Sequence, residues 1–483
     1  MADGGYDVTD YRDIDPLFGT LEEAEELIAE ANRLGIRVII DIVPNHCSDK
    51  HAWFRAALAA KPGSTERERF WFRPGRGANG EDPPNEWRSF FGGSAWTRTT
   101  NPDGSPGDWY LHLFASGQPD LNWSNLEVRR EHEDVLRFWF DRGVAGARID
   151  SATLLFKDAA LPDFDPEHAL VPHPYIDRDE LHELYREWRA IADSYPGSRI
   201  LVGEIWLPDR DRFARYLRPD ELHTAFDFEF LACPWEAARL RAVIDATLAA
   251  HDPVGASPTW VLSNHDVTRD VTRYGRAETG LGSEEETCSI RTVDLMRGTR
   301  RARAAALLTQ ALPGAVCIYQ GEELGLSEVE DLPENVLQDP VFFRSGGTNP
   351  GRDGCRVPLP WEGDAPPFGF SDGNASAPPW LPQPASWRNF TAAFQVSDPR
   401  SMLTLYRKAL HIRRQERAFG DGPIRWLSAP ANVLAFSRGD KLICVVNLSE
   451  ESVELPPHHG VLLASELLDG DLLPADAAVW LRT

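Results

Sequence analysis

The stretch RVIIDIVPNH at residues 37–46 decides the fold class, because a nearly continuous apolar run passes directly into polar residues. Runs of the same kind recur at long intervals along the chain, at residues 144–150, 200–206, 224–230, 259–266 and 315–321. Such runs, bounded by turn residues, are typical of strands buried on both faces of a parallel sheet. We therefore expect a parallel strand at each of these positions.

Helical patterns separate the expected strands. The segment TLEEAEELIAEANRLG at residues 20–35 begins with Thr20 and Glu23 at the spacing of a capping box, and a second helical pattern covers residues 179–195. Regular alternation of strand and helix favours a parallel sheet with right-handed crossover connections. The expected fold class is therefore α/β.

Two regions interrupt this alternation and predict further domains. Residues 47–110 are rich in Gly, Pro and Trp and are too long for an ordinary connection, so we expect a small inserted domain there. Beyond about residue 418, short alternating runs predict antiparallel strands. The predicted domains are a catalytic barrel (1–46 and 111–415), the inserted domain (47–110) and a C-terminal β-sandwich (416–483).

Composition excludes several classes of partner. The 483 residues include 50 Lys and Arg against 75 Asp and Glu, which gives a formal net charge of −25. A field of this sign repels nucleic acid phosphates and anionic lipids. There is no apolar stretch of about 18 residues and no export leader at the start of the sequence. We expect no nucleic acid partner and no membrane association.

The cysteines indicate a reducing compartment. They stand singly, without the spacing of metal knuckles or of a disulfide framework. We therefore expect reduced thiols and a cytoplasmic protein. The six positions are Cys47, Cys233, Cys288, Cys317, Cys355 and Cys444.

Several expected strands end in residues that can carry chemistry. Asp150 closes the run at 144–150, Glu204 lies near the end of the run at 200–206, and Asp266 closes the run at 259–266. In a parallel barrel the carboxyl ends of the strands carry the active site. Cleavage of a glycosidic bond needs a nucleophilic carboxylate and a protonated acid. Taken singly, an acid at a strand end is more often a helix cap or a salt bridge.

Residues next to Asp150 and Glu204 suggest a different role for each of these two acids. Arg148 lies two residues before Asp150, so both side chains point to one face of a strand. A guanidinium there would hold Asp150 ionised and nucleophilic. Glu204 precedes Ile205 and Trp206, and burial against an indole would raise the pKa of its carboxyl group, as a general acid requires.

The motifs resemble those of a known family. DIVPNH (41–46), GARID (146–150), GEIW (203–206) and VLSNHD (261–266) are similar to the four signature segments of glycoside hydrolase family 13, the α-amylase family, and QPDLNW (118–123) resembles a fifth. DGGYDVTDY (3–11) and GRDGCRVPLPW (351–361) narrow the resemblance to the branch of α-glucosidases, oligo-1,6-glucosidases and trehalose synthases, and most closely to bacterial α-glucosidases. The resemblance implies a (β/α)8 TIM barrel.

The resemblance also implies roles for individual residues. Asp150 would be the nucleophile, Glu204 the general acid/base and Asp266 the stabiliser of the transition state. Other residues would contact the non-reducing glucose or line its pocket, with Arg356 a better match than Arg352 for an arginine over the site. These substrate-binding candidates are Asp3, Tyr6, His46, Phe91, Phe114, Gln118, Arg148, Ser151, His265, Arg352 and Arg356.

Two departures from the family pattern carry expectations of their own. In this branch valine after the nucleophile goes with α-1,6 linkages and smaller or polar residues with α-1,4, so Ser151 favours α-1,4. Family members also have a strand, a helix and a second strand before the segment that begins at Asp3. We expect this chain to lack the first two barrel strands and to expose sheet edges, through a start codon placed too late, a truncation or a variant closed in another way.

The expected activity is that of a retaining, exo-acting α-glucosidase that releases terminal glucose from short oligosaccharides through a covalent glycosyl-enzyme. We expect no cofactor, and a family-type calcium or magnesium site would lie in the missing N-terminal segment. The protein would be a monomer or a weak homo-oligomer. Two alternatives stay open: a transglycosidase or isomerase such as trehalose synthase, and an inactive truncated scaffold.

Overall fold

The computed structural model describes residues 3–101, 103–164, 173–281, 292–371, 375, 377–420 and 422–483. Its chain divides into two compact units. The first unit contains Met1–Ala225, Val254–Ala256 and Gln338–Gly347, and the second contains Phe226–Pro253, Ser257–Leu337 and Thr348–Thr483.

A parallel sheet forms the centre of the first unit, as the sequence predicts. Its strands follow the order β1 (Ile39–Ile42), β5 (Gly146–Ile149), β6 (Ile200–Gly203) and β7 (Thr224–Asp227), whose first two residues pair with β6. The connecting helices α4 (Leu126–Asp141) and α5 (Glu180–Asp193) bury apolar faces that include Leu136 and Trp188. The remaining helices of this unit are α1 (Leu21–Arg33), α2 (Ala52–Ala59), α3 (Thr65–Glu68), α6 (Arg210–Arg215) and α11 (Pro340–Arg344).

Helix α1 begins as predicted but does not bury its apolar residues. The Thr20 side chain accepts from the Glu23 backbone, and the Glu23 side chain accepts from the Thr20 backbone, which confirms the capping box. Of the residues in α1 only Ile28 is buried, whereas Leu27 is 66% and Leu34 is 59% exposed. This part of the first unit therefore presents apolar surface.

Strand β1 is an edge strand, which corrects one expectation. Its hydrogen-bonded neighbour is β5, and no second neighbour is found among the described residues. Ile39 is 42% exposed, whereas Ile42 is buried. The prediction of a strand buried on both faces is therefore wrong for β1, because burial of a face requires elements packed against it and Ile39 is exposed.

A small antiparallel sheet lies between β1 and α4 in the sequence. Its strand order is β2 (Phe72–Arg73), β4 (Pro106–Leu111) and β3 (Trp96–Thr100). The aromatic residues Trp71, Trp87 and Trp96 belong to its core. These elements lie largely within the segment predicted to be an inserted domain, whose boundaries at 47–110 stay a prediction.

Parallel pairing also occurs in the second unit. The last two residues of β7 pair with β8 (Thr259–Val261), and β8 pairs with β9 (Ala315–Cys317). The predicted strand at 224–230 is wrong beyond Asp227, because α7 (Phe228–Ala232) begins there and the Asp227 carboxylate accepts from the Phe230 N–H as its N-cap. The other α-helices are α8 (Ala237–His251), α9 (Asp270–Tyr274), α10 (Leu295–Ala311), α12 (Ala392–Val396) and α13 (Met402–Gln415).

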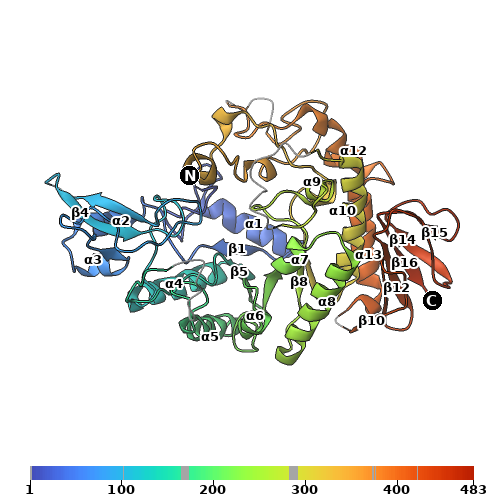
Figure 1. Cartoon of the computed structure of the whole chain (residues 1–483), viewed down its shortest axis with the longest axis horizontal. Helices are drawn as coiled ribbons and strands as arrows, with labels where there is room; N and C mark the ends of the chain where they lie inside the picture. Colours follow the sequence, from blue (N-terminus) through green and yellow to red (C-terminus); the bar gives the residue numbers. More distant parts are fainter. Residues whose placement is uncertain are drawn as a thin grey trace. The chain divides into compact units, whose positions relative to one another are not determined.

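The C-terminal residues form an antiparallel sheet, as predicted. Its strand order is β10 (Ile424–Trp426), β11 (Val433–Arg438), β12 (Leu442–Asn447), β16 (Ala477–Arg482) and β14 (Gly460–Ala464), and β13 (Val453–Glu454) pairs with β15 (Leu472–Leu473). Within the second unit, α10 and α13 lie against this sheet (Figure 1), and the Trp480 indole donates to the Leu307 carbonyl of α10. The sheet thus shares a core with the helices of its unit.

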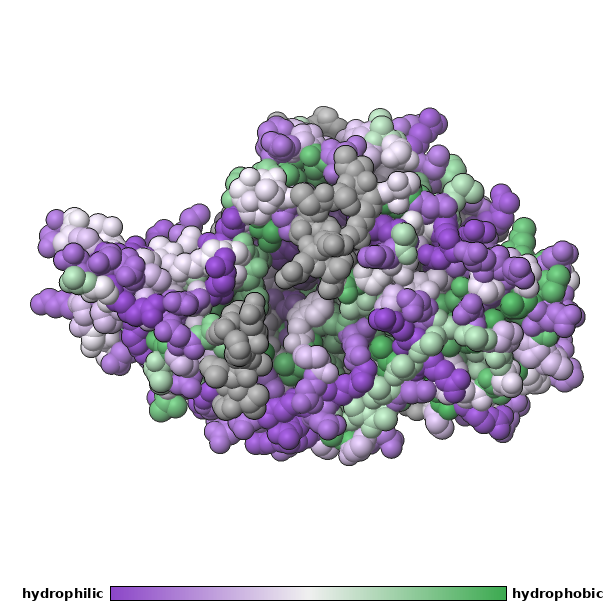
Figure 2. Space-filling model, viewed as in Figure 1, coloured by the Kyte–Doolittle hydropathy of each residue, from purple (hydrophilic) through white to green (hydrophobic). Residues whose placement is uncertain are grey.

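The residues on the surface and the state of the cysteines agree with what the composition predicts. Hydrophilic residues colour much of the face drawn in Figure 2. In the described part of the chain, no helix combines the length and the apolar character needed to cross a membrane. Five of the cysteines are free thiols, and the sixth, Cys288, lies outside the described residues.

Candidate active site

Arg148 is the centre of a charged cluster in the first unit. One terminal nitrogen of its guanidinium lies 2.7 Å from an Asp150 oxygen and 2.9 Å from an Asp41 oxygen, and the other lies 2.7 Å from a Glu204 oxygen. The side chains come from the carboxyl ends of the adjacent strands β1, β5 and β6. Asp150 and Glu204, which the sequence predicts to act together, therefore lie on one guanidinium.

A glycine permits the close approach of the strands that carry this cluster. A Cβ atom at Gly146, the first residue of β5, would lie 2.2 Å from the backbone oxygen of Ile200 in β6. Any larger residue would push the two strands apart. Gly146, the first residue of the motif GARID, thus allows β5 to pair closely with β6.

The ionisation of Asp150 differs from the simple expectation. Burial raises the pKa of its carboxyl group to about 6, although Arg148 acts in the opposite direction and Asp41 adds to the increase. Burial likewise raises the pKa of Asp41. Arg148 does not hold Asp150 fully ionised, because burial and the like charge of Asp41 together raise its pKa more than the guanidinium lowers it. The cluster therefore retains a proton at a pH where isolated carboxyl groups have lost theirs.

Glu204 is surrounded by donors. Its carboxylate accepts from the Ser151 N–H at 2.9 Å and from the Trp206 indole N–H at 3.3 Å, in addition to Arg148. Ile205 is buried as expected, but Trp206 is 47% exposed. Glu204 is itself buried, as expected, and the Trp206 indole contacts its carboxylate through the ring N–H.

Ser151 adopts a backbone conformation that is rare for its residue type. Its φ angle is +47°, in the left-handed region. This turn directly follows β5 and directs the Ser151 N–H toward Glu204. Strained residues that persist in a folded protein often serve a function. Here the strained residue follows Asp150 and donates its N–H to Glu204 on the neighbouring strand.

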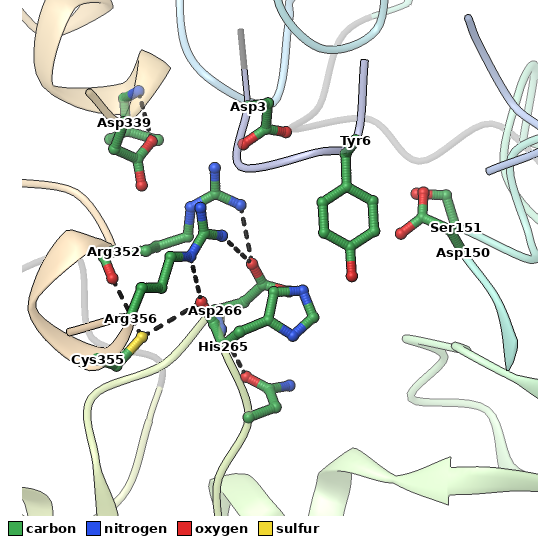
Figure 3. A network of polar contacts seen from close by, with 12 residues as sticks. Asp3, Tyr6, Asp150, Ser151, His265, Asp266, Asp339, Arg352, Cys355 and Arg356 are labelled. Carbon is green, nitrogen blue, oxygen red and sulfur yellow. Dashed lines mark hydrogen bonds and ion pairs between the residues drawn. The ribbon is translucent and has the colours of Figure 1, made fainter. Parts of the chain in front are cut away.

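Four predicted sugar-binding residues of the first unit lie together. His46 Nε2 is 2.9 Å from the Tyr6 carbonyl, and the Gln118 amide donates to the same carbonyl and to Asp3, each at 3.2 Å. The Tyr6 hydroxyl donates to Asp41 at 2.8 Å, so this group is continuous with the charged cluster. Figure 3 draws Tyr6 and Asp3 with Asp150 and Ser151.

Aromatic residues stand beside this group. The ring centroid of Phe114 is 5.0 Å from that of His46 and 5.5 Å from that of Phe91. Phe91 is buried and Phe114 is half-buried. The two predicted lining phenylalanines thus form one wall next to His46.

The second unit holds the remaining predicted residues around Asp266. Arg352 and Arg356 donate to the same oxygen of its carboxylate, at 2.8 and 2.9 Å, and Figure 3 shows both contacts. The Arg356 side chain also donates to the His265 carbonyl, and the Cys355 thiol donates to that carbonyl at 3.2 Å. The sequence left Arg352 and Arg356 as alternatives, and both contact Asp266. The candidate residues therefore form two groups, one in each unit.

The described residues contain no cluster of three or more His, Cys, Asp or Glu side chains that could hold a metal ion. The expectation about a calcium or magnesium site concerns a segment that precedes Asp3 in the family and stays a prediction.

Comparison with known proteins decides the family. Residues 1–422 match the family described as alpha amylase, catalytic domain, and residues 416–480 match a domain of unknown function, DUF3459. This chain belongs to the α-amylase family. The family consists of glycoside hydrolases and related enzymes, so the chain is an enzyme that acts on carbohydrate.

Individual relatives of this α-amylase family chain share most of its length. A probable alpha-glucosidase of Rhizobium meliloti is 36% identical over 100% of this chain and 87% of its own length. An oligo-1,6-glucosidase of Heyndrickxia coagulans is 30% identical over 93% of this chain and 83% of its own. The crystal structure of an alpha-glucosyl transfer enzyme, XgtA, has a TM-score of 0.81 and 34% identity, and covers 99% of this chain and 88% of that one.

Two residues that contribute to the site were not predicted from the sequence of this α-amylase family member. Asp41 of β1 pairs with Arg148 of β5. In the sequence, Asp41 could have been noticed as a charged residue inside an apolar run. Lys157 is buried and contacts Asn45, the neighbour of His46. A lysine seven residues after the expected strand end carries no local sign of burial.

Proposed function

We propose that this protein is a retaining, exo-acting α-glucosidase that releases the terminal non-reducing glucose of short oligosaccharides. The observation that supports this function best is the guanidinium of Arg148, which contacts Asp150 on one nitrogen and Glu204 on the other. A retaining enzyme holds its two carboxyl groups roughly 5–5.5 Å apart, and one guanidinium shared by both keeps them close. The relative named a probable alpha-glucosidase supports the same substrate class.

The proposed reaction has two displacements. An Asp150 oxygen attacks C1 of the glucose while the glycosidic C1–O bond breaks, and the leaving oxygen takes a proton from Glu204. Water then attacks C1 and gives a proton to the Glu204 carboxylate, and the ester bond to Asp150 breaks. Asp266 would stabilise the positive charge that develops at the sugar in each step. This chemistry uses carboxyl groups and water and needs no cofactor.

The proposed reaction needs one ionised and one protonated carboxyl group. Burial raises the pKa of Asp150 to about 6, so Asp150 would be ionised above that pH. In the reactive state Glu204 would carry the proton that it donates. Arg148 would then pair with the nucleophile while the acid donates.

The preferred linkage is proposed to be α-1,4. Ser151 follows the nucleophile and carries a small polar side chain, where a β-branched residue would narrow the space beside C1. Discrimination by one side chain amounts to roughly 1–3 kcal/mol. Maltose is therefore expected to be hydrolysed with a higher kcat/KM than isomaltose.

Incubation with maltose tests the function. We expect two molecules of glucose per maltose, with the non-reducing glucose appearing first as its α anomer in NMR spectra. Asp150→Asn should abolish hydrolysis, because an amide cannot form the glycosyl ester. Absence of glucose release by the wild-type protein, or full turnover by Asp150→Asn, would exclude this function or this nucleophile respectively.

A transglycosidase or isomerase is the second candidate, and the likeness to an alpha-glucosyl transfer enzyme favours it. Such an enzyme would use the same acids but would exclude water from the intermediate. Products separate the two: free glucose identifies the hydrolase, and trehalose or longer glucosides identify transfer. The absence of every product would indicate an inactive scaffold.

We also propose that the sheet is a (β/α)8 barrel that lacks its first two strands in this sequence. The exposed edge of β1, with Ile39 42% exposed beside the apolar surface of α1, supports the position of the gap. Acidic composition and free thiols support a cytoplasmic monomer or weak homo-oligomer. Equilibrium sedimentation of the purified protein tests its oligomeric state.

A further inference from the structure

We propose that Lys157 is a positioning residue that fixes the proton of His46, which the family resemblance places in contact with the non-reducing glucose. Lys157 lies in the first unit, six residues after Ser151, and its side chain is fully buried. A lysine is almost never fully buried unless it is paired. Its partners therefore show what it does.

All three donors of the Lys157 ammonium are used. Nζ lies 2.6 Å from an oxygen of Asp120, 2.7 Å from the Asn45 side-chain oxygen and 2.8 Å from the Leu154 carbonyl. Asp120 is fully buried as well, and its other oxygen accepts from the Leu113 N–H at 2.8 Å. The ion pair is therefore satisfied on both sides and holds one geometry.

Lys157 determines which way the Asn45 amide faces. Because an ammonium can only donate, the group that faces it must be the Asn45 oxygen. The Asn45 NH2 group then lies 3.3 Å from the Asp120 oxygen that also contacts Lys157 and 3.1 Å from His46 Nδ1, so both members of the ion pair fix the amide. Asn45 thus carries the orientation set by Lys157 to the imidazole of His46.

The orientation of Asn45 selects the tautomer of His46. An NH2 group facing Nδ1 requires that Nδ1 accept, so the single proton of the neutral ring resides on Nε2. The Gln118 NH2 group also lies 3.1 Å from Nε2, but its two N–H groups donate to Asp3 and to the Tyr6 carbonyl. Burial lowers the pKa of His46, which keeps the ring neutral. Nε2–H then donates to the Tyr6 carbonyl at 2.9 Å in the free protein, and the same N–H is available to a hydroxyl group of bound glucose.

Loss of Lys157 should therefore weaken sugar binding through a residue that Lys157 does not touch. Without the ammonium, the Asn45 amide can turn its oxygen toward His46, and the ring can move its proton to Nδ1. Nε2 would then face the sugar as an acceptor. The proposal rests on the proposed function only for the identity of the ligand, since the tautomer is a property of the free protein.

The test replaces the ion pair as a whole. Lys157→Met alone would leave the Asp120 carboxylate buried without its cation, so the variant is Asp120→Asn combined with Lys157→Met. We expect KM for maltose to rise roughly three- to tenfold, the effect of one lost hydrogen bond, with kcat within about twofold because the contact lies away from the reacting bond. An unchanged KM in the folded double variant would overturn the proposal.

A matched control separates positioning from stability. Arg67 pairs with Asp108 at 2.7 Å in the same unit and is also buried, but its contacts do not include a candidate site residue. Arg67→Met should lower the melting temperature and leave KM unchanged. Equal KM changes in both variants would show that Lys157 acts only through general stability.

A spectroscopic readout makes the result independent of turnover. In protein labelled with ¹⁵N-histidine, the His46 ring, assigned with His46→Gln, should show the Nε2–H tautomer, and the double variant should show a shift toward Nδ1–H. An unchanged tautomer would overturn the proposal even if no substrate were turned over. If the double variant does not fold, Asn45→Ala, which keeps the ion pair, should produce the same shift.

Discussion

The charge around Arg148 shows how single residues set the chemistry of this site. Asp41, Asp150 and Glu204 each contact the same guanidinium, so a change at one carboxylate alters the others. Burial raises the pKa of Asp150 to about 6. Because the nucleophile must be ionised, the kcat/KM of the wild-type protein should fall as the pH drops through about 6.

Asp41→Asn tests this coupling. Removing a negative charge beside Asp150 makes its ionisation easier, so its pKa should fall and the acid limb of the kcat/KM profile should move to lower pH. Asp41→Glu keeps the negative charge and serves as the control. The acid limb of its kcat/KM profile is expected near that of the wild type. A limb that stays at about pH 6 in Asp41→Asn would show that Asp41 does not influence the nucleophile.

The left-handed backbone at Ser151 predicts which replacements are tolerated. Glycine adopts φ values near +47° without a steric penalty, whereas a β-branched residue does not. Ser151→Val should therefore destabilise the protein by about 1–3 kcal/mol, and Ser151→Gly should change its stability little. Thermal unfolding of both variants measures the difference, and equal melting temperatures would contradict the assigned strain.

At the scale of elements, β1 and α1 show what a local pattern misses. The apolar run at 37–46 does form a strand and the capping box does start a helix. Burial of their apolar residues, however, depends on elements packed against them, and Leu27, Leu34 and Ile39 are exposed. An apolar sheet edge of this kind can pair with another chain.

Ile39→Lys should reduce self-association, because a lysine on an edge strand opposes pairing between sheets. The free energy of unfolding should change by less than about 0.5 kcal/mol, since Ile39 is 42% exposed.

Ile42→Lys provides the contrast within β1: Ile42 is buried, and a lysine there should destabilise the protein by more than about 4 kcal/mol. Sedimentation velocity at increasing concentration and denaturant titrations measure the two effects, and equal self-association of wild type and Ile39→Lys would exclude β1 as an adhesive edge.

At the scale of the whole molecule, the chain combines a family catalytic region with a C-terminal antiparallel sheet. The sheet does not stand apart within the second unit. Trp480 and Phe436 belong to the same apolar core as Leu307 of α10, and the buried Asp476 pairs with Arg297 and Arg301 of that helix.

A chain that ends at Gln415 should therefore fail to fold. Removal of the C-terminal sheet would expose the core side chains of α10 and leave Arg301 without the buried carboxylate of Asp476. We expect the shortened protein to be insoluble or to lack a cooperative thermal transition, measured by soluble yield and circular dichroism. A transition equal to that of the full chain would show that the C-terminal region is an independent domain.

The sequence by itself determined the order of strands and helices, the position of Asp150, Glu204 and Asp266 beyond strand runs, and the family, because each depends on residues close together in the chain. Only the tertiary structure decided that Asp41 shares Arg148 with both acids, that Lys157 reaches His46 through Asn45, and that α1 is exposed. Arg148 and Asp41 are 107 residues apart, and Lys157 and Asn45 are 112 apart. Contacts of this kind depend on which strands pair and which side chains are desolvated together, and no local pattern records either.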